Sequence, residues 1–131
     1  MLYSVEEEKF NMFARFEAIG RLVKDPSEGL RRVTINGEEV SVCTFTIACD
    51  GEFKDAPSDF YDCVAWRKTA DNLCNFMDKG KLIFIAGRPH TKTWEQDGVK
   101  KYRTEYKIDN IKFLERGKGA GAVANSDDTP F

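Results

Sequence analysis

The chain has 131 residues, of which 41% are hydrophobic and 12% aromatic, which is enough for one compact core and too few for two ordinary domains. Its formal net charge of −2 gives no hint of a nucleic-acid partner. The longest apolar run, residues 82–86, is too short to span a membrane, and the acidic residues 6–8 stand where a signal peptide would carry basic charge. We therefore expect one domain with polar tails in a soluble, cytoplasmic protein.

The charges are unevenly distributed along the chain. Residues 79–118 contain 11 Lys and Arg against 5 Asp and Glu, a net of +6, whereas residues 12–78 contain 8 against 12, a net of −4. The remaining acidity is terminal, at residues 6–8 and 127–128, where water solvates it. The near-zero total therefore hides a basic stripe in the second half of the chain.

The first half of the chain predicts β-strands separated by turns. After a polar, acidic extension over residues 1–11, the predicted strands cover residues 12–22, 31–35, 40–49 and 60–67. The dipeptide Asn36-Gly37 suits the tight turn of a hairpin, because both positions tolerate positive φ. Period-2 alternation in the third of these strands predicts a core face made of Cys43, Phe45, Ile47 and Cys49.

A helical period follows the fourth predicted strand. Thr69 is a candidate N-cap, Gly80 is a candidate helix stop, and the apolar positions between them are Ala70, Leu73, Cys74 and Met77. The remaining predicted strands cover residues 82–86, 88–94 and 99–114, and residues 96–98 turn the last two into a long hairpin. Pro89 is expected at an edge or a bend.

Short strands interrupted by one helix are typical of a known barrel. We predict an all-β domain over residues 12–116 with an OB-fold, a five-stranded Greek-key β-barrel with a long β-hairpin extension, whose curved face and loops hold oligonucleotides. A β-sandwich with an incidental helix is the alternative. Residues 117–126 are small and predict a flexible linker before an acidic tip at residues 127–131.

Four aromatic residues are candidates for stacking on bases. Phe60 and Trp66 share one face of the fourth predicted strand, Trp94 lies near the tip of the basic hairpin, and Phe53 lies in a polar loop. An aromatic side chain on a loop or hairpin tip is costly in water, whereas each stacked base contributes on the order of 1–3 kcal/mol. For any one of them alone, a place in the core or in a subunit interface is the more common alternative, and the basic hairpin weakens that alternative.

Neither metal chemistry nor catalysis is supported by the sequence. The four cysteines form no C-x-x-C pair, and three lie in apolar stretches, so buried thiols in a reducing cytoplasm are favoured over zinc ligands or disulfides. His90 is the only histidine, and no nucleophile, base and orienting group can be placed together. The glycines around Lys118 do not form a phosphate loop, because no helix follows them. We expect a binding protein with no cofactor and no metal, and not an enzyme.

Several short motifs follow one another in a recognisable order. They are Ile19-Gly20-Arg21-Leu22, Lys24-Asp25-Pro26, Phe45-Thr46-Ile47-Ala48, Asp59-Phe60 through Trp66-Arg67-Lys68, Lys79-Gly80, Phe84-Ile85-Ala86-Gly87, Thr93-Trp94, Tyr102-Arg103-Thr104-Glu105 and Ile111-Lys112-Phe113-Leu114. Over about residues 14–114, this order and spacing resemble those of the bacterial and phage single-stranded DNA-binding proteins. The resemblance implies an OB fold, a homotetramer of paired domains, and single-stranded DNA stacked on the positions that here are Phe53, Phe60, Trp66 and Trp94.

The end of the chain also resembles this family, whose acidic, Phe-terminated tip docks into apolar, basic pockets on replication and repair proteins. The resemblance assigns this partner binding to Asp127, Asp128, Pro130 and Phe131. The chain departs from the family in its acidic extension, in its short linker, and at Arg15, Glu17, Asp62, His90 and Thr93. These departures concern the oligomer interface, the phosphate contacts and the number of nucleotides covered.

The resulting hypothesis is sequence-independent, salt-sensitive binding of single-stranded DNA during replication, recombination and repair. Phosphate neutralisation is assigned to Arg21, Lys68, Lys79, Lys92, Lys101 and Arg103. One alternative is an OB-fold interaction module that bridges replication proteins through its tail and touches DNA little. Another is RNA binding, because stacking and phosphate contacts do not by themselves distinguish the sugar.

Overall fold

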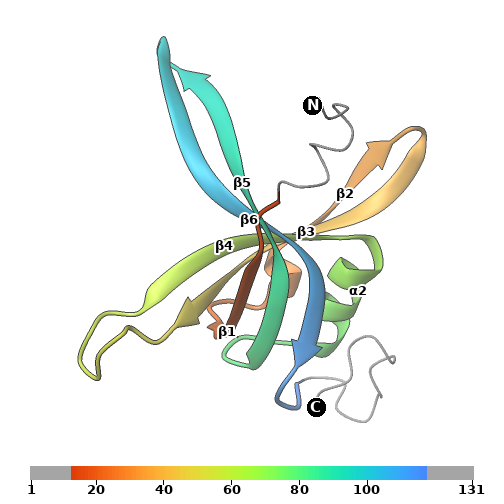
Figure 1. The fold of residues 1–131 in the computed structure, drawn as a ribbon. Coiled ribbons are helices and arrows are strands. Elements are labelled where there is room, and N and C mark those ends of the chain that lie inside the picture. Colours follow the sequence, from red (N-terminus) through yellow and green to blue (C-terminus); the bar gives the residue numbers. More distant parts are fainter. Residues whose placement is uncertain (1–12, 118–131) are drawn as a thin grey trace, which may run out of the picture.

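The computed structural model describes residues 13–117 of the chain. Its elements, in chain order, are β1 (Phe16–Leu22), η1 (Pro26–Gly29), β2 (Leu30–Ile35), β3 (Glu38–Cys49), β4 (Asp59–Trp66), α2 (Arg67–Phe76), β5 (Leu82–Gln96) and β6 (Val99–Phe113). In Figure 1 the strands wrap around a common centre with α2 against one side. No helix in this part of the chain is long and apolar enough to cross a membrane.

Five of the strands close into a barrel. Antiparallel pairs join β1 to β5, β5 to β6 and β3 to β4, and a short parallel pair joins β4 to β6. The ring is closed by β1 and β3, where Arg21 lies opposite Ala48 and Leu22 opposite Ile47. Within residues 13–117, β2 pairs with β3 alone and lies outside the ring. The predicted five-stranded OB-fold barrel with one helix is therefore confirmed.

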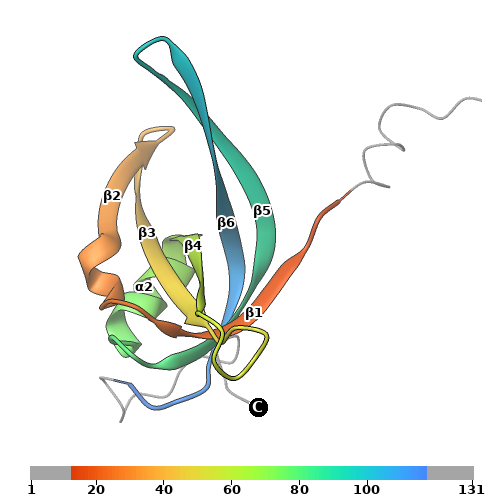
Figure 2. The same cartoon turned by 90° about the vertical axis from the view of Figure 1, so that its left-hand side faces the viewer.

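Two hairpins project from the same end of the barrel (Figures 1 and 2), and in the view of Figure 1 they diverge. The β2–β3 hairpin turns at Asn36 and Gly37, whose φ angles of 52° and 80° confirm the predicted tight turn. The longer β5–β6 hairpin begins where β5 passes Gly87, the last residue opposite β1. A Cβ at Gly87 would clash with the carbonyl oxygen of Lys107, so the close approach of the two strands there requires glycine.

The strand β5 is one continuous element and not the two strands predicted over residues 82–86 and 88–94. A register irregularity between Ala86 and Gly87 absorbs the bend, so the hydrogen-bonded ladder with β6 continues through it. Pro89 lies just beyond this point, where β6 is the neighbour of β5 in the described sheet. The expectation that Pro89 marks an edge or a bend is confirmed.

The core fills the barrel and the space under α2. Its largest fully buried side chains include Ile47, Leu73, Ile83, Ile85 and Ile111. The predicted core face of β3 is confirmed, because Cys43, Phe45 and Ile47 are buried and Cys49 is half-buried. Burial of this apolar surface is the main term that stabilises so small a domain.

The helix begins and ends earlier than the sequence predicts. Its first residue is Arg67, whose φ of 56° turns the chain sharply out of β4, so the predicted N-cap Thr69 already lies inside the helix. The helix ends at Phe76, and Gly80 is not its stop. Gly80 has a φ of 88°, which glycine adopts without steric cost, and its N–H donates to the Leu22 carbonyl at 2.8 Å. Its conformation therefore forms the turn that leads into β5.

The described cysteines are free thiols in or near the core. Cys43, Cys63 and Cys74 are buried, and Cys49 is partly exposed. Burial raises the pKa of the Cys63 thiol, which keeps it protonated and unreactive at neutral pH. The expectation of buried thiols is confirmed for these three residues.

Candidate nucleic-acid interface

The outer face of β4 carries two exposed aromatic rings. Phe60 is 63% exposed and Trp66 is 39% exposed, and the exposed Asp62 lies between them. Cys63 and Ala65 point into the barrel and are buried. Successive side chains of a strand point to opposite faces, so the alternation places Phe60, Asp62 and Trp66 on the outer face, as the structure shows. Val64 lies on that face too but is buried.

The β5–β6 hairpin carries an aromatic and basic face. Trp94 is 40% exposed and lies opposite Lys101, and Lys92 lies opposite Arg103. Residues directly opposite one another share a face, so these four side chains lie on the same side of the hairpin. No ion pair within residues 13–117 engages the three cations, whose charges are therefore open to an anionic ligand.

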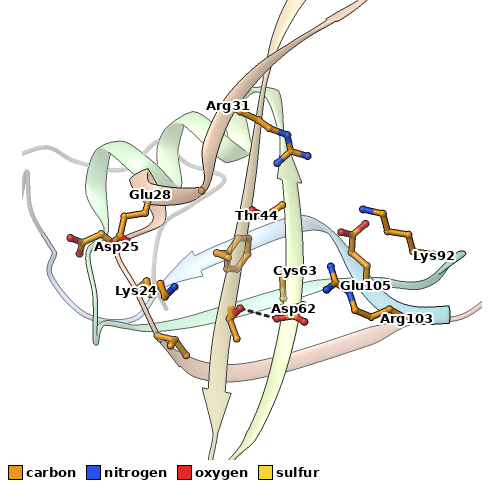
Figure 3. Close-up of a pocket in the computed structure, with 14 residues that line it drawn as sticks. Lys24, Asp25, Glu28, Arg31, Thr44, Asp62, Cys63, Lys92, Arg103 and Glu105 are labelled. Carbon is orange, nitrogen blue, oxygen red and sulfur yellow. Dashed lines mark hydrogen bonds between the residues drawn. The ribbon is translucent and has the colours of Figure 1, made fainter. Parts of the chain in front are cut away.

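A hollow of about 550 Å³ joins the two faces (Figure 3). It lies among η1, β3, β4 and the hairpin. The charged side chains that line it are Lys24, Arg31, Lys92, Arg103, Asp25, Glu28, Asp62 and Glu105. The structure therefore brings the outer face of β4 and the cations of the hairpin to one surface, although the two are far apart in the sequence.

A smaller hollow extends this surface along β4. It is lined by Trp66 and Thr69 on one side and by Arg88 and Lys107 on the other. Arg88 lies opposite Lys107, on the same hairpin face as Lys92. The aromatic ring of Trp66 thus has cations beside it, which is the combination that holds a base and its phosphate.

Four cations of these hollows were missed by the sequence assignments. Arg88 is four residues before Lys92, and Lys107 is four residues after Arg103, so the two-residue period of a strand places them on the same hairpin face. That period is the sequence signal that identifies them. Lys24 and Arg31 come from the segments before and after η1. No periodic signal marks them, because their position depends on how η1 packs beside β3.

Four predicted phosphate contacts line neither hollow, and one of them, Lys101, lies opposite Trp94 further along the β5–β6 hairpin. Arg21 donates to the Gly80 carbonyl at 3.0 Å and forms an ion pair with Glu115 at 2.9 Å. Its hydrogen bond lowers the pKa of the Glu115 carboxyl, so a phosphate at Arg21 would have to displace a stable carboxylate. Lys68 in the first turn of α2 and Lys79 in the turn before β5 are exposed.

Phe53 stands apart from the other predicted stacking residues. It is 72% exposed in the loop between β3 and β4, which projects away from the two hairpins in Figure 1. The predicted partner-binding residues Asp127, Asp128, Pro130 and Phe131 lie outside the described part of the chain, as does the N-terminal extension.

A closed five-stranded barrel with one helix and an exposed aromatic, basic surface defines an OB-fold protein of the kind that holds oligonucleotides or oligosaccharides. Residues 13–114 match the single-strand binding protein family, and the chain belongs to this family. The family assignment agrees with the resemblance in the sequence motifs.

Curated relatives support this assignment. The chain is 41% identical over 88% of its length to the single-stranded DNA-binding protein of Bacillus cereus, and 38% identical over 85% of its length to single-stranded DNA-binding protein A of Bacillus subtilis. It spans 68% and 64% of those two proteins. Single-stranded DNA-binding protein 2 of Clostridium acetobutylicum is 39% identical over 83% of the chain and 81% of its own length. These are names of binding proteins and not of enzymes.

Proposed function

We propose that this protein binds and protects single-stranded DNA without reading its sequence. The observation that carries the proposal is that exposed aromatic rings and unpaired cations occur together on the outer face of β4 and the β5–β6 hairpin. Trp66 lines a hollow with Arg88 and Lys107, Trp94 lies opposite Lys101, and Phe60 is exposed on the same face of β4 as Trp66. Every base has a π-face, so stacking accepts any sequence, while cations neutralise the phosphates between the bases. The family and the names of the relatives support the same function.

The stacking rings contact separate bases along the bound strand. Phe60 and Trp66 are six residues apart, which is about 20 Å along an extended strand. The cations Lys92, Lys101 and Arg103 lie on the hairpin side of the same surface, and Arg88 and Lys107 continue it toward Trp66. This arrangement sets bases against the rings of β4 and against Trp94 of the hairpin, and sets the phosphates against the hairpin cations.

The biological role that we propose is protection of unpaired DNA during replication, recombination and repair, in the cytoplasm at the nucleoid or at phage replication sites. Partner proteins are recruited through the acidic tip made of Asp127, Asp128, Pro130 and Phe131. Two carboxylates followed by a terminal aromatic ring fit a pocket that is both basic and apolar. This part of the proposal is supported by the resemblance in sequence.

The same proposal includes a homotetramer. Residues 16–20 of β1 pair with β5 on one side, and the pairing of β1 with β3 is limited to Arg21 and Leu22, so among residues 13–117 most of one edge of β1 has no partner strand. Ile19 is 51% exposed beside Phe84 on the outer surface of the β1–β5 pair. An open edge and an exposed apolar side chain favour association with a second copy.

The first experiment is quenching of tryptophan fluorescence on titration with oligo-dT at low and high salt, with duplex DNA as the control. We expect strong quenching by oligo-dT that weakens as salt is added, because Trp66 and Trp94 lie on the proposed surface. Absence of both quenching and binding at low salt would favour the interaction module instead. Competition with a matched RNA oligonucleotide tests the RNA alternative.

A further inference from the structure

The stacking surface contains a carboxylate, although a carboxylate repels phosphate groups. Asp62 is exposed on the outer face of β4, two residues after Phe60 and four residues before Trp66. One residue advances a strand by about 3.4 Å, so the carboxylate lies about 7 Å along β4 from the phenyl ring. A base stacked on Phe60 therefore brings its polar edge within reach of Asp62.

The carboxylate of Asp62 is held in place from the neighbouring strand. Thr46 lies opposite Asp62, and its hydroxyl donates to Asp62 Oδ1 at 2.8 Å. A carboxylate accepts about four hydrogen bonds and donates none, so this contact leaves most of its acceptor capacity unused. No ion pair within residues 13–117 involves Asp62, although Arg103 and Lys92 line the same hollow.

The position of Asp62 in the hollow leaves the unused acceptor sites of its carboxylate open to a bound base. In Figure 3 the residue lies between Lys24 on one side and Lys92, Arg103 and Glu105 on the other. These cations are available for the flanking phosphates. The acceptors of Asp62 are then left for the polar edge of the base itself.

The chemistry of the four bases makes this acceptor selective. Cytosine, adenine and guanine each present an exocyclic amino group, which donates well to a carboxylate. Thymine has no amino group, and its one edge donor, N3–H, lies between two carbonyl oxygens that a carboxylate repels. A fixed, unpaired carboxylate therefore discriminates against thymine and in favour of the amino-bearing bases.

We propose that Asp62 is a base-discriminating residue that favours bases with an exocyclic amino group over thymine within the single-stranded DNA site. The inference rests on the proposed function and adds a base preference to it. The preference is a bias at one position of the bound strand and not recognition of a sequence. Thr46 is its positioning residue, because its hydroxyl orients the carboxylate.

The test compares affinities for oligo-dC and oligo-dT of equal length at one salt concentration and slightly alkaline pH. Homopolymers differ in flexibility, so the informative quantity is the ratio of the dT to the dC dissociation constant, compared between the natural protein and Asp62→Asn. The asparagine amide has the same shape and can donate to a thymine carbonyl. We expect the ratio to fall on the order of fivefold in Asp62→Asn, as expected for one solvent-exposed hydrogen bond to a charged group.

Three further variants separate hydrogen bonding from charge. Asp59→Asn removes one negative charge from the same strand on the opposite face, and the ratio should not change. Thr46→Val removes the hydroxyl that holds Asp62, so the ratio should fall partway, and Thr46→Ser should restore it. Far-UV circular dichroism checks that each variant keeps the fold.

The outcomes distinguish this inference from the proposed function. If Asp62→Asn binds both oligonucleotides with an unchanged ratio, whether both bind tighter or not, the discrimination is refuted and DNA binding stands. If the natural protein binds neither oligonucleotide at low salt, the proposed function fails and the base preference fails with it.

Discussion

Replacing Trp66 with alanine tests the proposed surface most directly. Trp66 is 39% exposed, so of roughly 250 Å² for an indole side chain about 100 Å² is open to a ligand. At about 25 cal/mol per Å², complete cover of that area contributes about 2.5 kcal/mol. One base covers a single face of the ring, so we expect a loss of about 1–2 kcal/mol, or about five- to thirtyfold in affinity.

The assay for Trp66→Ala is fluorescence anisotropy of a labelled oligo-dT, because the substitution removes one of the intrinsic fluorophores. Trp66→Phe is the matched control, since it keeps an aromatic ring and should retain most of the affinity. The Trp66 side chain makes no capping hydrogen bond at the start of α2, so we expect the helix to persist in both variants, as checked by circular dichroism. Natural affinity in both Trp66→Ala and Trp94→Ala would refute the assignment of the stacking surface.

The remaining predictions concern the charges around the barrel. The double substitution Lys92→Ala, Arg103→Ala should reduce the slope of log K against log salt by about 1.4, at about 0.7 per phosphate contact, and an unchanged slope in a salt titration would remove these residues from the interface. Arg21 holds the pKa of Glu115 below its usual 4.5, so the carboxylate stabilises the fold above about pH 4.5, and this stabilisation is lost as the pH falls through the lowered pKa. Glu115→Gln should therefore be less stable than the natural protein at pH 7 and should lose less stability on acidification, measured as thermal midpoints across pH 2–7.

Local patterns in the sequence determined most of the secondary structure and the exposure of the stacking rings. Alternation along β4 places Phe60 and Trp66 on one face and Cys63 on the other, and Asn36-Gly37 specifies a hairpin turn. These signals work because the direction of a side chain on a strand depends on the chain's own period, and a turn depends on the φ angles its residues tolerate.

The limits of the helix were decided by its surroundings. Thr69 and Gly80 have the chemistry of a helix start and stop, yet the helix runs from Arg67 to Phe76. The turn out of β4 at Arg67 begins the helix earlier than Thr69. Gly80 does not end the helix, because its N–H bonds to the carbonyl of Leu22 at the end of β1. Local propensity is a weak preference that such contacts override.

The partners of the charged side chains were decided by tertiary structure alone. Arg21 has the residue type of a phosphate contact, yet it pairs with Glu115, 94 residues away, because both lie at the same end of the barrel. Asp62 and Arg103 share a hollow because β4 and β6 pair in parallel across the closed sheet. By itself, the sequence determined a basic, aromatic β-barrel domain, and only the closure of that barrel decided which of its charges meet, since Coulomb interactions depend on distance in space and not along the chain.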